Sequence, residues 1–184
     1  MRKALGLVVG LALLAGCSTG WHRVTREEIA QPDVCLAFGF MDMSEAPSKM
    51  DYFVVKQTQP PRGHRFGFET DHGLFYHLAL PQGGYTLDEF GGTNKIGFFI
   101  FVLKRTLHRY DFFSNQTHFT LTAPGLYYLG SYKYVPNRDS FDIETKTAPS
   151  EGDLLLELLP KVSGTKWEPQ VRDRLAALGV RPSQ

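Results

Sequence analysis

The chain has 184 residues, 42% hydrophobic and 21% charged, and its 20 basic and 19 acidic side chains give a formal net charge of +1. This balance argues against a nucleic-acid binder, which usually carries a clustered basic excess. An aromatic content of 13% argues against intrinsic disorder, and two cysteines are too few for a disulfide scaffold or a four-cysteine zinc site.

The N-terminus predicts a secretory leader. Arg2 and Lys3 precede residues 4–16, which carry no charged or polar side chain and are too few to cross a bilayer, where about 20 apolar residues are needed. Leu14-Ala15-Gly16-Cys17 resembles the lipobox of bacterial lipoproteins. The resemblance implies cleavage before Cys17, a diacylglyceryl group on its thiol and acylation of its new amine. An ordinary secretory leader with an incidental Cys17 is the alternative.

The lipobox also suggests a location. Removal of residues 1–16 leaves 168 residues with 18 basic and 19 acidic side chains, so the sequence shows no polybasic cluster and attachment relies on acyl chains. Ser18 follows the cysteine where, in the lipoprotein pattern of enteric bacteria, an aspartate signals retention in the inner membrane. We therefore expect the outer membrane, on its periplasmic face.

Residues 17–32 are expected to be the lipidated cysteine and its tether. Within them, the segment from Thr25 to Glu28 is typical of a capped helical turn that Pro32 ends. Cys35 follows in a predicted strand, and we expect a buried thiol there. A reactive or intermolecular thiol is the alternative.

Residues 33–148 predict an antiparallel β-sandwich of about seven strands. The pattern consists of short aromatic and β-branched segments separated by proline and glycine turns. In 73–80, Leu74, Tyr76, Leu78 and Leu80 alternate onto one face. Segment 96–103 is apolar on both faces, which predicts a covered central strand that is too short to span a membrane. The predicted strands are 34–41, 52–57, 73–80, 85–90, 96–103, part of 112–122 and 126–135, with turn signals that include 81–84 and Gly91-Gly92.

Residues 149–184 predict a C-terminal helical extension of two short α-helices. The first covers 151–159 and ends at Pro160. The second begins at about Trp167, and its apolar stripe is expected to dock on the sandwich. A helix offered to a partner is the alternative. The stripe consists of Trp167, Val171, Leu175 and Leu178.

Two segments resemble a known family. Residues 80–87 (LPQGGYTL) look like the turn and following strand of prealbumin-like (transthyretin-like) modules. Residues 123–130 (APGLYYLG) are similar to a later strand of small bacterial lipoproteins of uncharacterised function that carry such domains. The resemblance spans about 33–143 and implies a sandwich in an accessory or binding role. It carries over no catalytic residue.

Two polar or aromatic groups are candidate sites. Asp71-His72 with His77 could bind a metal or act as a base. A separation of five positions, however, puts the two histidines on opposite faces if one strand runs through both. Asp71-His72-Gly73 is also typical of a turn that opens a strand. Tyr128, Tyr132 and Tyr134, predicted on one face with Tyr127 on the other, could form an aromatic binding strip. Packing of these rings in the core is the favoured alternative.

The sequence therefore favours a non-catalytic envelope lipoprotein that binds a protein partner, with the lipid on Cys17 and no other cofactor. A small-ligand or glycan binder using the tyrosines or the His72 region is the second hypothesis. A hydrolase is the third, and it would need a nucleophile that no motif in the sequence supplies.

Overall fold

The computed structural model describes residues 24–61, 63–98, 101–111, 118–138 and 140–181, with the backbone alone for 94–98, 101–109 and 111. The leader, including the lipobox and Cys17, lies outside the described residues. The elements in chain order are α1 (Arg26–Ala30), β1 (Val34–Asp42), β2 (Tyr52–Gln59), β3 (Arg65–Asp71), β4 (Leu74–Pro81), β5 (Gly83–Phe98), β6 (Phe101–Asp111), β7 (His118–Leu121), β8 (Leu126–Pro136), β9 (Phe141–Lys146), α2 (Glu151–Leu158), the 3-10 turn η1 (Leu159–Lys161) and α3 (Trp167–Ala177).

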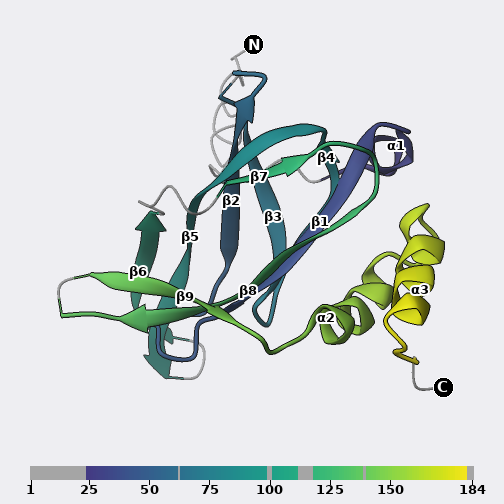
Figure 1. The fold of residues 1–184 in the computed structure, drawn as a ribbon. Helices are drawn as coiled ribbons and strands as arrows, with labels where there is room; N and C mark the ends of the chain where they lie inside the picture. Colours follow the sequence, from purple (N-terminus) through teal and green to yellow (C-terminus); the bar gives the residue numbers. More distant parts are fainter. Residues whose placement is uncertain (1–23, 62, 99–100, 112–117, 139, 182–184) are drawn as a thin grey trace, which may run out of the picture.

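The strands form one curled sheet (Figure 1). Eight of them follow the order β6-β5-β2-β3-β4-β1-β8-β9, and β7 pairs with β5. Strands β1 and β8 are parallel, whereas the other described ladders are antiparallel. The prediction of a mainly β fold with C-terminal helices docked on it is confirmed, but the antiparallel sandwich of about seven strands is wrong.

The missed strands are those with a polar face. Strand β9 (FDIETK) alternates between partly buried and exposed residues at the end of the strand order, and β3 (RFGFETD) has one fully buried residue. Neither has the continuous aromatic and β-branched character on which the strand predictions rested. Strand β3 pairs with β2 and β4, and β9 pairs with β8; the context of these neighbouring strands, which composition does not reveal, decides whether such polar segments form strands.

The concave side of the sheet holds an aromatic-rich core. Curling brings the two ends of the strand order together through ring contacts. Phe141 of β9 lies 5.8 Å from Phe90 of β5 between ring centroids, and Tyr134 of β8 lies 5.1 Å from Tyr110 of β6. Other buried members include Phe53 and Phe75, whose rings stack at 3.9 Å. This core therefore fixes the curvature of the sheet.

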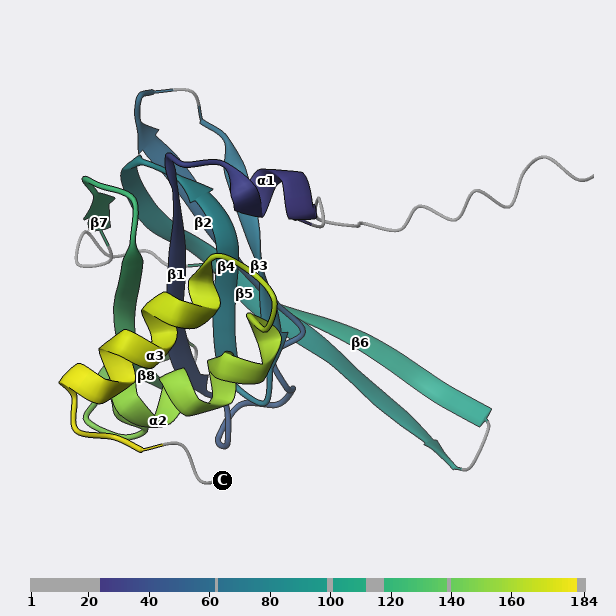
Figure 2. The ribbon, with the colours of Figure 1, turned by 90° about the vertical axis from the view of Figure 1, so that its right-hand side faces the viewer.

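A second hydrophobic cluster joins the C-terminal helices to the outer side of the sheet. Trp167 is 1% exposed, and its indole Nε1 donates a hydrogen bond to the Leu78 carbonyl at 2.7 Å. Figure 2 shows α2 and α3 lying across β1 and β8. The predicted docking stripe is confirmed for Trp167, Val171 and Leu175, while Leu178 is 40% exposed and lies outside the contact.

The start of the described chain is tied to the same cluster. Thr25 caps α1 in a capping box, with its hydroxyl accepting from the Glu28 amide and the Glu28 carboxylate accepting from the Thr25 amide. Ile29 is buried in the outer cluster. The predicted helical turn before Pro32 is therefore confirmed.

Strand β4 departs from the predicted alternation near its end. Leu74, Tyr76 and Leu78 join the outer cluster as expected, but Leu80 joins the concave core. The register with β1 shifts between Cys35 and Ala37, which inserts an extra residue into β4. Because such a bulge reverses the faces of the residues that follow it, Leu80 turns inward.

Segment 96–103 is not one central strand. Strand β5 ends at Phe98 and β6 begins at Phe101, and the two are antiparallel neighbours with Phe98 opposite Phe101. Strand β2 accompanies β5 only as far as Gly91 in the described ladder. Beyond that residue β5 and β6 form a two-stranded ribbon that projects from the body (Figure 2). The continuous apolar character of segment 96–103 therefore belongs to the two strands of a projecting ribbon and not to one covered central strand.

Gly91 and Gly92 lie within β5 and do not form the predicted turn. A Cβ atom at position 92 would lie 1.8 Å from the Lys49 carbonyl oxygen. Only glycine allows the loop after β1 to approach β5 so closely. The Asp51 carboxylate accepts a hydrogen bond from the Thr93 amide at 2.8 Å, and this bond also holds the loop against β5.

We predict that Gly92→Ala lowers the free energy of unfolding by about 1–3 kcal/mol, because backbone must move to admit the methyl group. Gly84→Ala is the control, since its Cβ would meet the side chain of Gln59 at 3.2 Å. Both core clusters are made of residues from Val24 onward, so a chain beginning at Ser18 keeps the described core. Urea unfolding of that chain measures both variants, and equal losses would contradict the close-approach argument.

Candidate functional site

A pocket of 580 Å³ lies where β1 ends, beside the loop that leads to β2 and the turn between β3 and β4. It contains three methionines, three aspartates, Lys49 and His72. The full lining is Phe40, Met41, Asp42, Met43, Ser44, Lys49, Met50, Asp51, Thr70, Asp71, His72 and Gly73. We refer to it as the methionine pocket.

A tight hairpin turn places His72 at the pocket. His72 has φ 49° and Gly73 has φ 97°, so both central residues of the β3–β4 turn occupy the left-handed region typical of two-residue hairpins. A Cβ at Gly73 would lie 2.6 Å from the Phe40 ring and 2.9 Å from the Met41 carbonyl oxygen. The turn that the sequence predicted is therefore present, and it leaves the His72 side chain 89% exposed.

The carboxylate of Asp71 links this turn to the helical layer. Lys161 Nζ lies 2.5 Å from Asp71 Oδ2, and His72 Nδ1 lies 2.6 Å from Asp71 Oδ1. The pKa of Asp71 is lowered, first by the hydrogen bond from Lys161 and then by that with His72. The carboxylate that orients His72 is thus already shared with a lysine.

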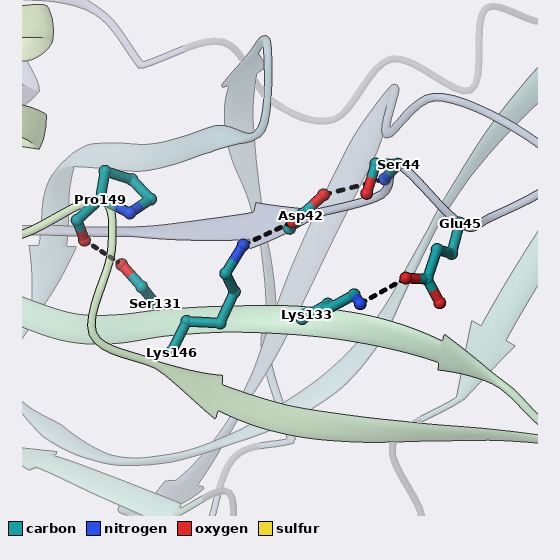
Figure 3. A network of polar contacts seen from close by, with 7 residues as sticks. All are labelled: Asp42, Ser44, Glu45, Ser131, Lys133, Lys146 and Pro149. Atoms are coloured by element: carbon teal, nitrogen blue, oxygen red, sulfur yellow. Dashed lines mark hydrogen bonds and ion pairs between the residues drawn. The ribbon is translucent and has the colours of Figure 1, made fainter.

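A second set of ion pairs holds the loop after β1 (Figure 3). Lys146 of β9 reaches Asp42 at 2.5 Å, and Lys133 of β8 pairs with Glu45. Asp42 also accepts from the Ser44 amide at 2.9 Å. The hydrogen bond from Lys146 is the main reason that the pKa of Asp42 falls from 3.8 to about 2.

These contacts define what the methionine pocket can do. Asp42, Asp51 and Asp71 each accept a hydrogen bond from a protein donor. Methionine side chains are flexible and polarisable, so they adapt to apolar ligands of varied shape. The pocket is therefore suited to binding a partly apolar molecule.

The structure does not bring His72 and His77 together. His77 is buried at 6% exposure on the concave side, where its ring centroid lies 5.5 Å from that of Phe68. Its Nδ1 accepts a hydrogen bond from the Ala79 amide at 3.2 Å, within the bulged part of β4. Within the part of the chain that the structure describes, no cluster of three histidine, cysteine or carboxylate side chains could hold a metal ion.

Cys35 lies in the concave core with no exposed surface. Its thiol donates to the Ala123 carbonyl oxygen at 3.3 Å. Burial is the main cause that raises the pKa of this thiol, which disfavours the reactive thiolate. The structure agrees with the expectation of a buried thiol.

The sequence analysis predicted that the three candidate tyrosines share a face of the sheet, and this prediction is wrong. Tyr128 packs in the outer cluster, 5.6 Å from Phe38 between ring centroids, whereas Tyr132 and Tyr134 pack in the concave core. Two residues of β8, at positions 129 and 130, oppose Gly39 alone. This bulge, with Gly130 at φ 107°, reverses the faces between Tyr128 and Tyr132.

A smaller pocket of 170 Å³ between β7 and β8 collects some of these tyrosines. Tyr127, Tyr128 and Tyr132 line it, together with residues of β7 that include His118 and Phe119. Tyr134 is 5% exposed and stacks on Phe141 at 5.4 Å. The continuous exposed strip is thus replaced by a small pocket and a buried ring.

The sequence analysis missed most of the methionine pocket. One signal was available, because the three methionines after Met1 all lie within residues 41–50. Their grouping with Asp71 and His72 depends on the pairing of β1 with β4, which no local pattern specifies.

Comparisons of the chain with protein-family models, with curated proteins and with solved structures found no match. The described helices are all too short or too polar to cross a membrane.

We predict that Lys146→Met lowers the free energy of unfolding by about 1–2 kcal/mol at neutral pH and that the difference vanishes near pH 2. The folded-state pKa of Asp42 is depressed to about 2 from 3.8. Its contribution is therefore present above pH 4 and lost as the pH falls through 2. Urea unfolding at several pH values measures the difference from the parent.

The matched control is Lys133→Met, which removes the neighbouring ion pair with Glu45. Those two side chains are 28% and 45% exposed, so solvent screens their interaction and the loss should be clearly smaller than that caused by Lys146→Met. Equal effects of the two variants would show that Asp42 has no special stabilising role.

Proposed function

We propose that this chain is a lipid-anchored, non-catalytic lipoprotein of the bacterial envelope that acts as an accessory, partner-binding protein. Its proposed location is the periplasmic face of the outer membrane. The observation that carries this proposal is the leader ending in Leu14-Ala15-Gly16-Cys17, followed by Ser18. Two or more acyl chains on Cys17 would anchor the protein stably.

The start of the folded body fits such an anchor. Thr25, the cap of α1, follows Cys17 by eight positions, and Ile29 is already buried against the sheet. Eight residues reach at most about 28 Å when fully extended. A body tethered so closely would work next to the membrane.

The contacts of the candidate catalytic residues support a non-catalytic role. The Cys35 thiol is buried with a raised pKa, and the buried His77 accepts a hydrogen bond from a backbone amide. His72 projects from a turn beside Asp71, whose carboxylate Lys161 shares. These are structural contacts, and they are consistent with a binding role.

We predict that the full-length Cys17→Ala variant receives no lipid and keeps its leader uncleaved. Cys35→Ala is the matched control, because it removes the other cysteine and should retain both cleavage and attachment. Metabolic labelling with a fatty acid and mass measurement of the purified protein give the result. A labelled, cleaved Cys17→Ala protein would overturn the anchor proposal.

Partner binding has its own test in cells. Crosslinking and pull-down of the anchored protein should recover an envelope protein that the Cys17→Ala form does not recover. Recovery of the same set by both forms would show that the anchor contributes nothing to partner choice. A repeatedly empty pull-down would count against the partner-binding role.

The methionine pocket favours a second candidate function, the binding of a small ligand. Its volume of 580 Å³ lies within the range of small-molecule sites. Thermal-shift measurements of the chain beginning at Ser18 against envelope glycans and small, partly apolar molecules test this candidate. A shift that Met43→Gln abolishes would support it, and flat curves across the set would count against it.

A further inference from the structure

The β5–β6 ribbon is the part of the fold that extends beyond the body. Its ladder continues from Thr93 opposite Leu107 to Phe98 opposite Phe101, past the point where β2 stops pairing with β5. At about 3.3 Å per residue the projecting part is roughly 20 Å long. Figure 2 shows the ribbon pointing away from both the sheet and the helices.

The register sorts the residues of the ribbon into two zones. The tip, which we define as residues 96–98 and 101–103, contains uncharged residues only. Directly behind it, Lys95 is the partner of Arg105, and Lys104 is the partner of Ile96. We call Lys95, Lys104 and Arg105 the basic collar. Antiparallel pairing thus gathers basic residues that lie up to ten positions apart in the sequence.

The charged residues of the ribbon are all basic. Four basic residues and no acidic residue occur between Glu89 and Asp111, although the whole chain is nearly neutral. The ribbon therefore carries an excess of positive charge in its sequence, which is complementary to an anionic surface.

An isolated pair of strands is marginally stable in water. Apolar residues presented outside the core usually mark an interaction site. Lipid offers both features that the two zones require, because acyl chains match the apolar tip and anionic headgroups match the basic collar. The tip is too short to cross a bilayer, for which a strand needs about 9–11 residues. Shallow insertion at the headgroup boundary is the geometry that remains.

We propose that the β5–β6 ribbon is a membrane-docking element that inserts its tip into a surface rich in anionic lipid and holds headgroups with the basic collar. In Figure 2 the start of α1 and the ribbon both lie on the right of the body. A chain tethered before α1 could therefore meet one membrane with both features. The proposal goes beyond the lipid anchor and does not require it.

The test uses the chain beginning at Ser18, which lacks Cys17, and vesicles of phosphatidylglycerol mixed with phosphatidylcholine or of phosphatidylcholine alone. We expect binding to the anionic vesicles that weakens as salt increases. Replacing all three collar residues with glutamine should weaken binding about a hundredfold, at roughly fivefold for each charge. Cosedimentation gives the affinities.

The control removes the same number of charges from the body. Lys56, Arg138 and Arg181 are exposed and lie outside the ribbon. Their replacement by glutamine leaves the same net charge as the collar variant, and binding should stay within about threefold of the parent, since only charges close to the lipid surface contribute strongly. Equal losses in the two triple variants would show general attraction between charges and would overturn the proposal.

Two variants test the contribution of the tip to membrane binding. The double variant Phe98→Ser with Phe101→Ser should weaken binding at least tenfold and leave the urea unfolding of the body unchanged. In a Trp21→Phe background, the variant Phe98→Trp should gain fluorescence that brominated lipids quench more strongly than the signal of that background, whose remaining Trp167 is buried.

Several outcomes would overturn the proposal. These are absence of parent binding, parent-like binding by the double variant, or a dimer that the double variant dissociates, which would mean that a second copy covers the ribbon. Failure of vesicle binding leaves the lipid anchor standing, because the anchor is tested by labelling of Cys17 in cells. Failure of labelling equally leaves the ribbon proposal intact.

Discussion

The fold depends on the burial of β1 on both of its faces. Cys35, Ala37 and Met41 pack into the concave core, while Val34, Leu36 and Phe38 pack under the C-terminal helices. The strand is hydrogen-bonded to β4 on one side and to β8 on the other. Gly39 lets it lie close to its neighbours, because a Cβ there would lie 2.5 Å from the Phe75 ring and 2.7 Å from the Gly130 carbonyl oxygen. The two hydrophobic clusters therefore share one strand, which contributes buried side chains to both.

Local patterns in the sequence predicted the elements that are stabilised locally. The capping box at Thr25, the helix from Trp167 and the turn at His72 all depend on residues within one or two turns of chain, and all are present. The sheet topology depends instead on contacts between distant residues. The parallel pairing of β1 with β8 joins residues about 90 positions apart, so alternation and composition contain no signal for it.

Faces of strands were predictable only up to the first bulge. A strict period of two assigns Leu80 to the face of Leu74, and Tyr128 to the face of Tyr132 and Tyr134. The inserted residues in β4 and β8 reverse both assignments. Gly130 at φ 107° was the one residue in the sequence that could have indicated the second bulge, because glycine adopts that conformation without strain. The tyrosine strip failed as a surface for this backbone reason, although the residues were aromatic as required.

The loop between β1 and β2 contacts both the methionine pocket and the root of the β5–β6 ribbon. Lys49, Met50 and Asp51 line the methionine pocket. The same segment fixes the root of the ribbon, because the Lys49 carbonyl lies where a side chain at Gly92 would be and Asp51 bonds the backbone of Gly91 and Thr93. Ion pairs of Asp42 and Glu45 with β9 and β8 hold the beginning of the loop to the sheet. Residues 49–51 therefore belong both to the wall of the methionine pocket and to the contacts that hold the root of the ribbon, so their position affects the shape of both.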